Sequence, residues 1–271
     1  MKKQTILITG ASSGIGKATA LLLHEKGHTI YAAARQVEKM KDLAEKGIKV
    51  IAMDVTKEDS MVAGVNAIFK EAGPIDVLVN NAGYGSYGAL EDVPMSEARY
   101  QFEVNIFGMA RLTQLVLPKM REQRRGKIIN ISSIGGKLGE PHGVWYHATK
   151  YAVEGLSDSL RMELKEFGID VVIIEPGAII TEWAGIAREH MLKTSGNTAY
   201  GALTQKHAKM FERADKMGSK PDVIAKTIDR AIASKRPKTR YASGGGAKMI
   251  LFMRKILPDR TFDKLVLSMM K

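Results

Sequence analysis

Short apolar segments alternate with longer amphipathic segments along most of the chain. The first pair is Thr5–Thr9, which is apolar and β-branched, and Ile15–Lys26, where apolar residues recur at helical spacing until Gly27. Strands that are apolar throughout are typical of a parallel sheet covered on both faces. Repetition of this pair predicts an α/β fold with a single doubly wound parallel sheet of about seven strands and helices on both faces.

The predicted strands are Thr5–Thr9, His28–Ala34, Lys49–Asp54, Asp76–Asn80, Lys127–Ser132, Asp170–Glu175 and Lys238–Ala242. The predicted helices are Ile15–Lys26, Val37–Lys46, Asp59–Ala72, Pro94–Met120, Tyr146–Phe167 and Pro221–Ser234. No linker or internal repeat separates them, so we expect residues 1–271 to form one domain.

The alternation breaks after the sixth predicted strand. Residues 182–218 contain Met and aromatic side chains among polar and basic ones and no strand pattern, which predicts a helical lid or wall over the substrate. Gly244–Gly246 is expected to act as a hinge, and it leads into an apolar and basic helical tail over residues 244–271.

Composition narrows the classes of function. There is no cysteine, which excludes disulfides and thiolate metal sites, and the six histidines show no metal-ligand spacing. The net charge of +12 suits a phosphorylated ligand, an anionic lipid or a nucleic acid, but no nucleic-acid motif is present, so no specific nucleic-acid partner is expected. The first apolar run is too short for a signal peptide, and we expect a cytoplasmic protein.

A glycine-rich turn joins the first predicted strand to the first helix. Its spacing is G-x-x-x-G-x-G, with Gly10, Gly14 and Gly16 as the glycines. Such glycines permit a tight turn, close approach of the backbone to a pyrophosphate, and close packing of helix on strand. The N–H groups at the helix start then hold the phosphates. The turn therefore predicts a dinucleotide site formed by Gly10, Ser12, Ser13, Gly14, Ile15 and Gly16.

Tyr146 and Lys150 are four residues apart and share one face of a predicted helix. An ammonium about 4 Å from a phenol, at an effective dielectric constant of about 20, favours the phenolate by roughly 4 kcal/mol. This would lower the pKa of Tyr146 by about three units and make it a proton donor or acceptor near neutral pH. The alternative is that both are ordinary residues of a half-exposed helix.

Several separated motifs occur in one order along the chain. They are Thr9–Gly16, Asn80-Asn81-Ala82-Gly83, Asn105, Ser133, the Tyr146/Lys150 pair and Pro176-Gly177. On these residues the chain resembles the short-chain dehydrogenase/reductase family. Pro176–Trp183 and Leu257–Arg260 resemble the branch that contains hydroxysteroid and retinol dehydrogenases and acyl-dihydroxyacetone-phosphate reductases. The resemblance implies a Rossmann fold and interconversion of a carbonyl and an alcohol by hydride transfer.

The same resemblance implies four catalytic residues. Tyr146 would exchange the proton with the substrate oxygen, and Lys150 would lower the pKa of Tyr146 and hold the nicotinamide ribose. The family's serine precedes its tyrosine by 13 residues, which selects Ser133 to bind the substrate oxygen. Asn105 would hold a water that connects Lys150 to solvent; its alternative is a helix-packing contact.

The remaining cofactor contacts are also implied by the resemblance. The cofactor ribose would lie against Asn81-Ala82-Gly83, and the adenine against Asp54-Val55, although Asp54 could instead cap the following turn. The nicotinamide carboxamide would be held after Pro176-Gly177, by the backbone near Ile179 and the hydroxyl of Thr181.

Arg35 indicates which dinucleotide is used. NAD-binding folds of this type place an acidic residue near the end of the second strand, and here the chain has Ala34 followed by Arg35. A guanidinium suits a 2′-phosphate because its planar fork donates two hydrogen bonds and carries full charge. We therefore predict NADP(H); the alternative is that Arg35 simply faces solvent.

The substrate and partners are less constrained. The apolar region 182–218 and tail predict a bulky lipophilic ketone, aldehyde or alcohol, and His142 and Trp145 are expected to line its mouth. An acyl-carrier-protein 3-oxoacyl thioester is an alternative, since +12 suits an acidic carrier. A non-catalytic NADP-sensing regulator is an alternative of another class, but it would be expected to have lost catalytic residues.

Two surfaces are candidates for assembly. Helices 94–120 and 146–167 are where members of the family usually dimerise, so we expect a homodimer or homotetramer. Met249–Leu257, with basic residues beside apolar ones, could lie on an anionic membrane. We favour the interpretation that the tail packs on its own domain or covers a partner subunit.

Overall fold

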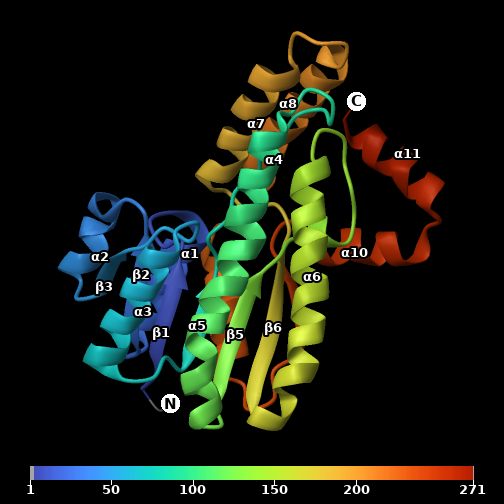
Figure 1. Ribbon diagram of the computed structural model, residues 1–271. Helices are drawn as coiled ribbons and strands as arrows, with labels where there is room; N and C mark the ends of the chain where they lie inside the picture. The colour runs from blue at the N-terminus through green and yellow to red at the C-terminus, as the bar shows by residue number, and fades with distance from the viewer. Residues whose placement is uncertain (1–2, 271) are drawn as a thin grey trace.

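The computed structural model describes residues 3–270, apart from the side chain of Asp215. Seven parallel strands form one sheet in the order β3-β2-β1-β4-β5-β6-β7 (Figure 1). The strands are β1 (Thr5–Thr9), β2 (Thr29–Ala34), β3 (Lys49–Ala52), β4 (Val77–Asn80), β5 (Gly126–Ile131), β6 (Ile169–Pro176) and β7 (Arg240–Ser243). The predicted doubly wound α/β sheet is confirmed.

The helices lie in two layers. They are α1 (Gly14–Glu25), α2 (Lys41–Glu45), α3 (Glu58–Ala72), α4 (Met95–Phe102), α5 (Met109–Glu122), α6 (Val144–Leu164), α7 (Glu182–Ser195), α8 (Gly201–Met217), α9 (Asp222–Ala233), α10 (Ala247–Ile256) and α11 (Asp259–Met269). In Figure 1, α3, α5 and α6 cover the near face of the sheet, and α1 packs with α9 on the far face.

Successive side chains of β1 enter different cores. Ile6 and Ile8 pack with α1 and α9 residues, whereas Leu7 packs with residues of α3 and α5 on the other face. All three are fully buried. Because both faces are covered, the strand is apolar at every position rather than at alternate positions.

The order of the strands reverses at β1. Ile8 pairs with Ala32 of β2 on one side and with Val79 of β4 on the other. The connections from these two strands therefore leave in opposite directions, and a crevice opens at their carboxyl ends, where open α/β sheets bind ligands.

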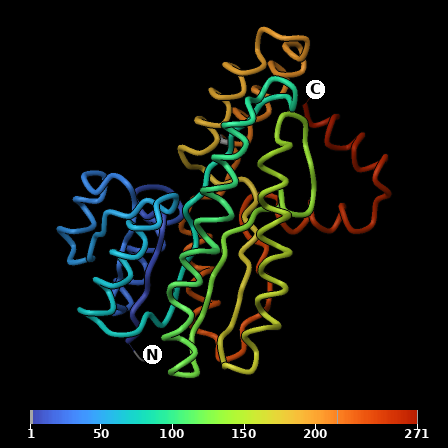
Figure 2. The backbone as a smooth tube through the Cα atoms, viewed as in Figure 1, coloured from blue at the N-terminus to red at the C-terminus, as the bar shows by residue number. Residues whose placement is uncertain are grey.

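The predicted helix Pro94–Met120 is not a uniform α-helix. Figure 2 shows one continuous rod, but residues Glu103–Gly108 between α4 and α5 are π-helical. A Cβ atom at Gly108 would lie 2.2 Å from the carbonyl oxygen of Val55, so only glycine lets the rod pass this close to the loop after β3. Apolar periodicity does not reveal this local widening, which is common at functional sites.

Two regions depart from the alternating pattern, as predicted. Residues 182–218 form α7 and α8, which stand above the carboxyl edge of the sheet in Figure 1, and α10 and α11 form an arm beside α6. The predicted hinge at Gly244–Gly246 connects β7 to α10, and its flexibility stays a prediction. Ala178 N–H donates to the Gly245 carbonyl at 3.1 Å and Gly245 N–H donates back at 3.2 Å, which fixes this segment to the loop after β6.

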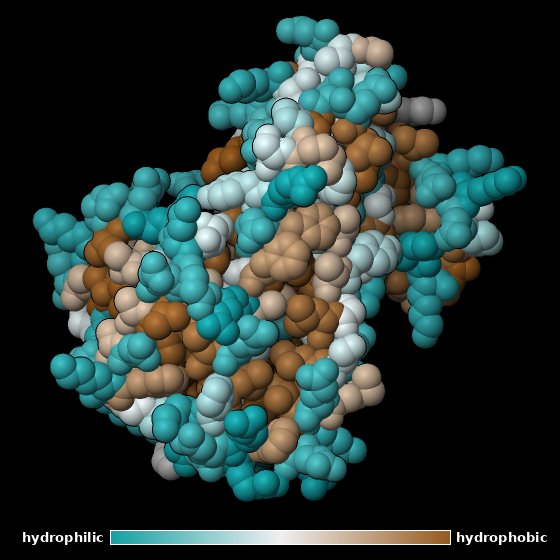
Figure 3. Space-filling model, in the orientation of Figure 1, coloured by the Kyte–Doolittle hydropathy of each residue, from teal (hydrophilic) through white to brown (hydrophobic). Residues whose placement is uncertain are grey.

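Apolar side chains are exposed on two surfaces. On the arm, Met249, Phe252 and Ile256 are each more than half exposed, so these side chains do not pack on their own domain as the favoured interpretation of the tail allowed. On the face of α4, α5 and α6, hydrophobic side chains gather between charged ones (Figure 3), and Phe107 and Met162 are among the most exposed. Within residues 3–270, every helix is too short or too polar to span a bilayer.

Candidate active site

The glycine-rich turn occupies the crevice at the end of β1. Gly10 and Gly14 have φ angles of +64° and +53°, in the left-handed region that favours glycine. A Cβ atom at Gly16 would lie 2.4 Å from the carbonyl oxygen of Gly10. The turn can therefore close onto α1 only with glycine at these positions, which leaves the amino-terminal N–H groups of α1 facing the crevice.

Thr9 and Asn81 join this turn to the end of β4. The Thr9 hydroxyl oxygen accepts the backbone N–H groups of Asn81 and Ala82 at 3.1 and 3.0 Å. The Asn81 amide donates to the carbonyls of Thr9 and Gly10 at 3.0 and 3.1 Å. The predicted segment Asn81–Gly83 thus lies directly against the glycine-rich turn.

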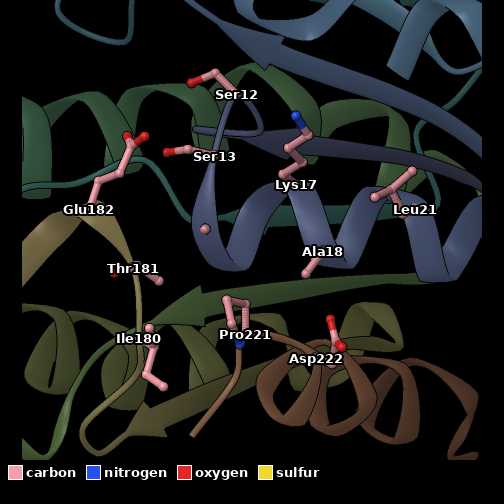
Figure 4. A pocket seen from close by; sticks show the side chains of 11 residues that line it. Ser12, Ser13, Lys17, Ala18, Leu21, Ile180, Thr181, Glu182, Pro221 and Asp222 are labelled. Atoms are coloured by element: carbon pink, nitrogen blue, oxygen red, sulfur yellow. The ribbon is translucent and has the colours of Figure 1, made fainter. Parts of the chain in front are cut away.

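A cavity of about 430 Å³ lies beside the start of α1 (Figure 4). It is lined by Ser12, Ser13, Gly14, Lys17, Ala18, Leu21, Ile180, Thr181, Glu182, Pro221 and Asp222. The two predicted cofactor loops meet here, because a Cβ atom on Gly14 would lie 3.1 Å from the Thr181 methyl group. Lys17 was missed from the sequence, although its position one turn into the helix after the glycines was a usable signal.

The cofactor-side residues fit a dinucleotide. The turn is a cradle that side chains would fill, and a helix amino terminus favours the negative charge of phosphate. Arg35 is exposed at the end of β2, where one guanidinium nitrogen donates to the Tyr100 hydroxyl at 3.1 Å. One oxygen of Asp54 accepts both the N–H and the hydroxyl of Thr56, so Asp54 caps its turn, and the adenine contact stays a prediction.

The four predicted catalytic residues come from three different elements. Tyr146 and Lys150 lie in the first two turns of α6, Ser133 precedes a short 3-10 turn after β5, and Asn105 lies in the π-helical segment. The Lys150 ammonium donates to the Ile131 carbonyl at 2.9 Å, and a Cβ atom on Gly83 would lie 3.1 Å from Asn105 Oδ1 and 3.9 Å from Lys150 Nζ. The fold therefore brings these groups to one place at the carboxyl edge.

The predicted lowering of the Tyr146 pKa by Lys150 is wrong for this structure. The ammonium lies 5.8 Å from the centre of the tyrosine ring and is directed to Ile131 instead. Burial raises the pKa of Tyr146 to about 12, while the neighbouring Ser133 hydroxyl acts in the opposite direction. Burial also lowers the pKa of Lys150 to about 8, partly opposed by Glu154. Loss of hydration outweighs the attraction that helical spacing alone suggests.

Asn105 is 3% exposed and its amide is hydrogen-bonded on both sides. Its oxygen accepts the Tyr84 N–H at 3.1 Å, and its nitrogen donates to the Tyr84 carbonyl at 2.9 Å and the Thr149 hydroxyl at 3.0 Å. Asn105 thus ties the loop after β4 to α6. The proton-relay water stays a prediction.

Aromatic side chains surround the Tyr146 ring. Trp183, at the start of α7, lies 5.0 Å away between ring centres, and Tyr87 lies 5.6 Å away. Phe211 of α8 packs against Tyr87 at 5.2 Å. Tyr87 was missed from the sequence because it belongs to no motif, and only the fold brings it to the site.

Trp145 and His142 do not lie where the sequence placed them. Trp145 packs on Phe102 of α4 and lines a separate cavity of about 250 Å³ on the outer face, so its prediction as a substrate-mouth residue is wrong. Residue 145 points outward because it precedes Tyr146 on the helix, about 100° away. His142 is 4% exposed and contacts His207 and Thr204, so it is a buried residue beneath α8.

Comparison with known proteins agrees with this geometry. The family model described as short chain dehydrogenase matches residues 4–191. The chain belongs to the short-chain dehydrogenase/reductase family. Among similar proteins, a 3-ketodihydrosphingosine reductase from Bacteroides thetaiotaomicron is 39% identical over 96% of this chain and 95% of that protein.

Two further relatives cover almost the whole chain. An NADPH-dependent 3-dehydrocapnine reductase from Ornithobacterium rhinotracheale is 35% identical over 96% of this chain and 94% of that protein. The crystal structure of a short-chain dehydrogenase from Streptomyces avermitilis has a TM-score of 0.82 at 33% identity, and the match covers 97% of this chain and 95% of that one. The protein is thus an oxidoreductase of a family whose fold binds a nicotinamide cofactor.

The buried Lys150 predicts a pH-dependent stability. Its pKa is about 8 when folded and 10.5 when exposed, so between these values the unfolded chain binds more protons. The free energy of unfolding should therefore rise with pH across this window, by up to about 3 kcal/mol from this group. Urea unfolding of the wild type and Lys150→Met from pH 7 to about 10 measures it. The free energy of unfolding of the wild type should increase with pH relative to that of the variant. Parallel dependences on pH would contradict the prediction.

Proposed function

We propose that this protein is an NADP(H)-dependent oxidoreductase that interconverts a lipophilic carbonyl compound and its alcohol. The observation that carries the proposal is the assembly of Tyr146, Lys150 and Ser133 at the carboxyl edge, beside the glycine-rich turn. A non-catalytic regulator would be expected to have lost these three residues and Asn105. All four are present, which disfavours that alternative.

When bound, the nicotinamide supplies or accepts the hydride. In the reducing direction the Tyr146 hydroxyl donates its proton to the substrate oxygen. A pKa raised by burial keeps that proton on Tyr146 at neutral pH until the oxygen becomes basic enough to take it. The Ser133 hydroxyl oxygen accepts the Gly135 N–H at 3.0 Å, and its own hydrogen, which is within reach of the Tyr146 hydroxyl, would be donated to the substrate oxygen.

Lys150 would hold the nicotinamide ribose through its ammonium hydrogens. Its pKa of about 8 means that the charged ammonium form is favoured below pH 8. On the cofactor side, Gly10, Ser12, Ser13 and Gly16 would cradle the pyrophosphate, and Ile179 and Thr181 would orient the carboxamide. Thr181 also accepts the Trp183 N–H at 3.3 Å as the cap of α7, so carboxamide binding and the position of α7 would be coupled.

The choice of NADP(H) rests on Arg35. Its side chain is exposed at the strand end and, among the described residues, forms no ion pair with a carboxylate, so its charge is available for a 2′-phosphate. The name of the 3-dehydrocapnine reductase includes NADPH dependence, which supports the same cofactor.

The wall around Tyr146 supports a lipophilic substrate. Trp183, Tyr87 and Phe211 form a contiguous aromatic cluster that packs with Met191 and Leu192. Residues 182–218 would therefore act as the predicted substrate wall. The keto compound in the name of the 3-ketodihydrosphingosine reductase also supports a ketone as substrate. A 3-oxoacyl thioester stays the alternative, and the cytoplasmic location stays a prediction.

Replacing Tyr146 by Phe should remove the proton donor while keeping the ring packed against Trp183. We expect kcat to fall by about 1,000-fold or more, with cofactor affinity retained. Steady-state rates with lipophilic ketones and with 3-oxoacyl thioesters, each with NADPH, would measure the loss and identify the substrate class. Turnover of Tyr146→Phe close to that of the wild type would reject this mechanism.

Replacing Arg35 by Ala should weaken NADPH binding selectively. We expect the KM for NADPH to rise roughly 10- to 100-fold with little change in the KM for NADH, because only NADPH carries the 2′-phosphate. Lys70→Ala, an exposed cation on α3, is the matched control. If the wild type uses both dinucleotides equally well, the assignment fails.

We also propose that the exposed apolar face of α4, α5 and α6 forms the subunit interface of a homo-oligomer. Phe107→Glu with Met162→Glu should place charges in this face and shift the protein to the 29.7 kDa monomer in analytical ultracentrifugation. Met217→Glu, at an exposed methionine of α8, serves as control. A wild-type protein that already sediments as a monomer contradicts this proposal.

A further inference from the structure

The outer face of helix α10 is apolar. Met249, Phe252 and Ile256 are 68%, 61% and 54% exposed. Because they are three and four residues apart, they form one apolar stripe along the helix. A surface helix of a soluble domain normally turns its polar side outward, whereas a helix with apolar residues all round is buried or lies in a membrane. The stripe therefore requires an apolar environment that its own domain does not supply.

The opposite face of α10 is held by the domain and by α11. Ala247 is 1% exposed, and Arg254 Nε donates to the Lys137 carbonyl in the loop after β5 at 3.3 Å. The Arg254 guanidinium also pairs with Asp259 of α11 at 2.7 Å and lies over the Phe262 ring. Arg254 and the stripe lie on opposite sides of the helix, so these contacts direct the stripe away from the loop and away from α11.

Lysines lie along one edge of the stripe. Lys248 and Lys255 are seven residues apart, so they share one side of α10, next to Phe252. Both are exposed, and within residues 3–270 neither forms an ion pair with a carboxylate. The helix itself contains no Asp or Glu. An apolar face bordered by lysines is typical of helices that lie in the interface of an anionic membrane.

The same character continues into α11. Leu267 and Met269 are 46% and 49% exposed, and Arg260 and Lys264 are exposed as well. In residues 247–270 the cationic side chains outnumber the acidic ones. The cationic residues are Lys248, Arg254, Lys255, Arg260 and Lys264, and the acidic ones are Asp259 and Asp263. The arm is therefore positively charged, as is the whole chain at +12, and it suits a negatively charged partner.

A second copy of the chain fits the stripe less well. In a two-fold contact the same patch of both subunits meets itself. Such a contact would bring the cations of two α10 helices together with no carboxylate on either helix to pair with them. An anionic lipid surface covers the apolar stripe and neutralises the lysines at the same time.

We propose that α10 and α11 form a docking arm that lies on the surface of an anionic membrane. Met249, Phe252 and Ile256 would enter the boundary between headgroups and acyl chains, and Lys248 and Lys255 would contact the lipid phosphates. The contact is peripheral, because every helix within residues 3–270 is too short or too polar to span a bilayer. The inference goes beyond the proposed function and holds whichever compound the active site reduces or oxidises.

Vesicle flotation with the full-length protein tests the arm. Vesicles of phosphatidylcholine with about 30% phosphatidylglycerol are compared with vesicles of phosphatidylcholine alone. We expect the wild type to bind the anionic vesicles at least about tenfold more tightly than the neutral ones at about 0.1 M salt, and to bind them less as the salt concentration rises.

Variants separate the apolar stripe from the lysines. Phe252→Glu should weaken binding to the anionic vesicles at least about tenfold, because it places a carboxylate in the middle of the stripe. Lys248→Gln with Lys255→Gln should weaken it about 5- to 30-fold and reduce its dependence on salt.

Matched controls replace similar side chains outside the arm. Met217→Glu, at an 84% exposed methionine of α8, and Lys46→Gln with Lys70→Gln, at two exposed lysines near and on α3, should bind like the wild type. All of these substitutions are at exposed positions, so the Tm of each variant should stay close to that of the wild type.

Three outcomes would overturn the proposal. The first is a wild type that floats with neither kind of vesicle. The second is equal binding to neutral and anionic vesicles that the lysine substitutions leave unchanged. The third is a Phe252→Glu variant that, without vesicles, sediments at a lower mass than the wild type, which would make the stripe a contact between subunits.

Discussion

The site depends on the close approach of two chain segments at the point where the strand order reverses. The connections after β1 and β4 diverge there, yet the Thr9 hydroxyl and the Asn81 amide hold the two loops together through hydrogen bonds of 3.0 to 3.1 Å. Contact this close leaves no room for a Cβ atom on Gly10 or Gly16. The glycines thus allow the loops to meet, and the meeting point is where α1 presents its amino terminus to a phosphate.

Burial controls the electrostatics of the candidate catalytic groups more than proximity does. Tyr146 and Lys150 share a helix face, but the helix lies against the sheet, and both side chains lose most of their hydration. The pKa of the phenol rises and that of the ammonium falls, each toward its uncharged form. A tyrosine in this state keeps its proton until an oxygen beside it gains negative charge, which suits a general acid in carbonyl reduction.

The second half of the site is built by elements outside the sheet. α7 brings Trp183 against Tyr146, and α8 brings Phe211 and His207 against Tyr87. The loop before α6 supplies Glu140. Most of this wall is apolar, and the buried Glu140 carboxylate within it accepts the Tyr87 hydroxyl at 2.9 Å.

The sequence by itself determined the sheet, the order of its motifs and the candidate residues Gly10, Arg35, Ser133, Tyr146 and Lys150. These follow from local rules: apolar period, glycine freedom and fixed spacing along one chain. Tertiary structure alone decided three other matters. It set the direction of the pKa shifts, because burial depends on what packs over Tyr146. It also placed the π-helical segment against the loop at Val55, and it brought Glu140, Tyr87 and His207 together from distant segments. Such contacts have no signature in a single segment, because they form only when separate elements pack.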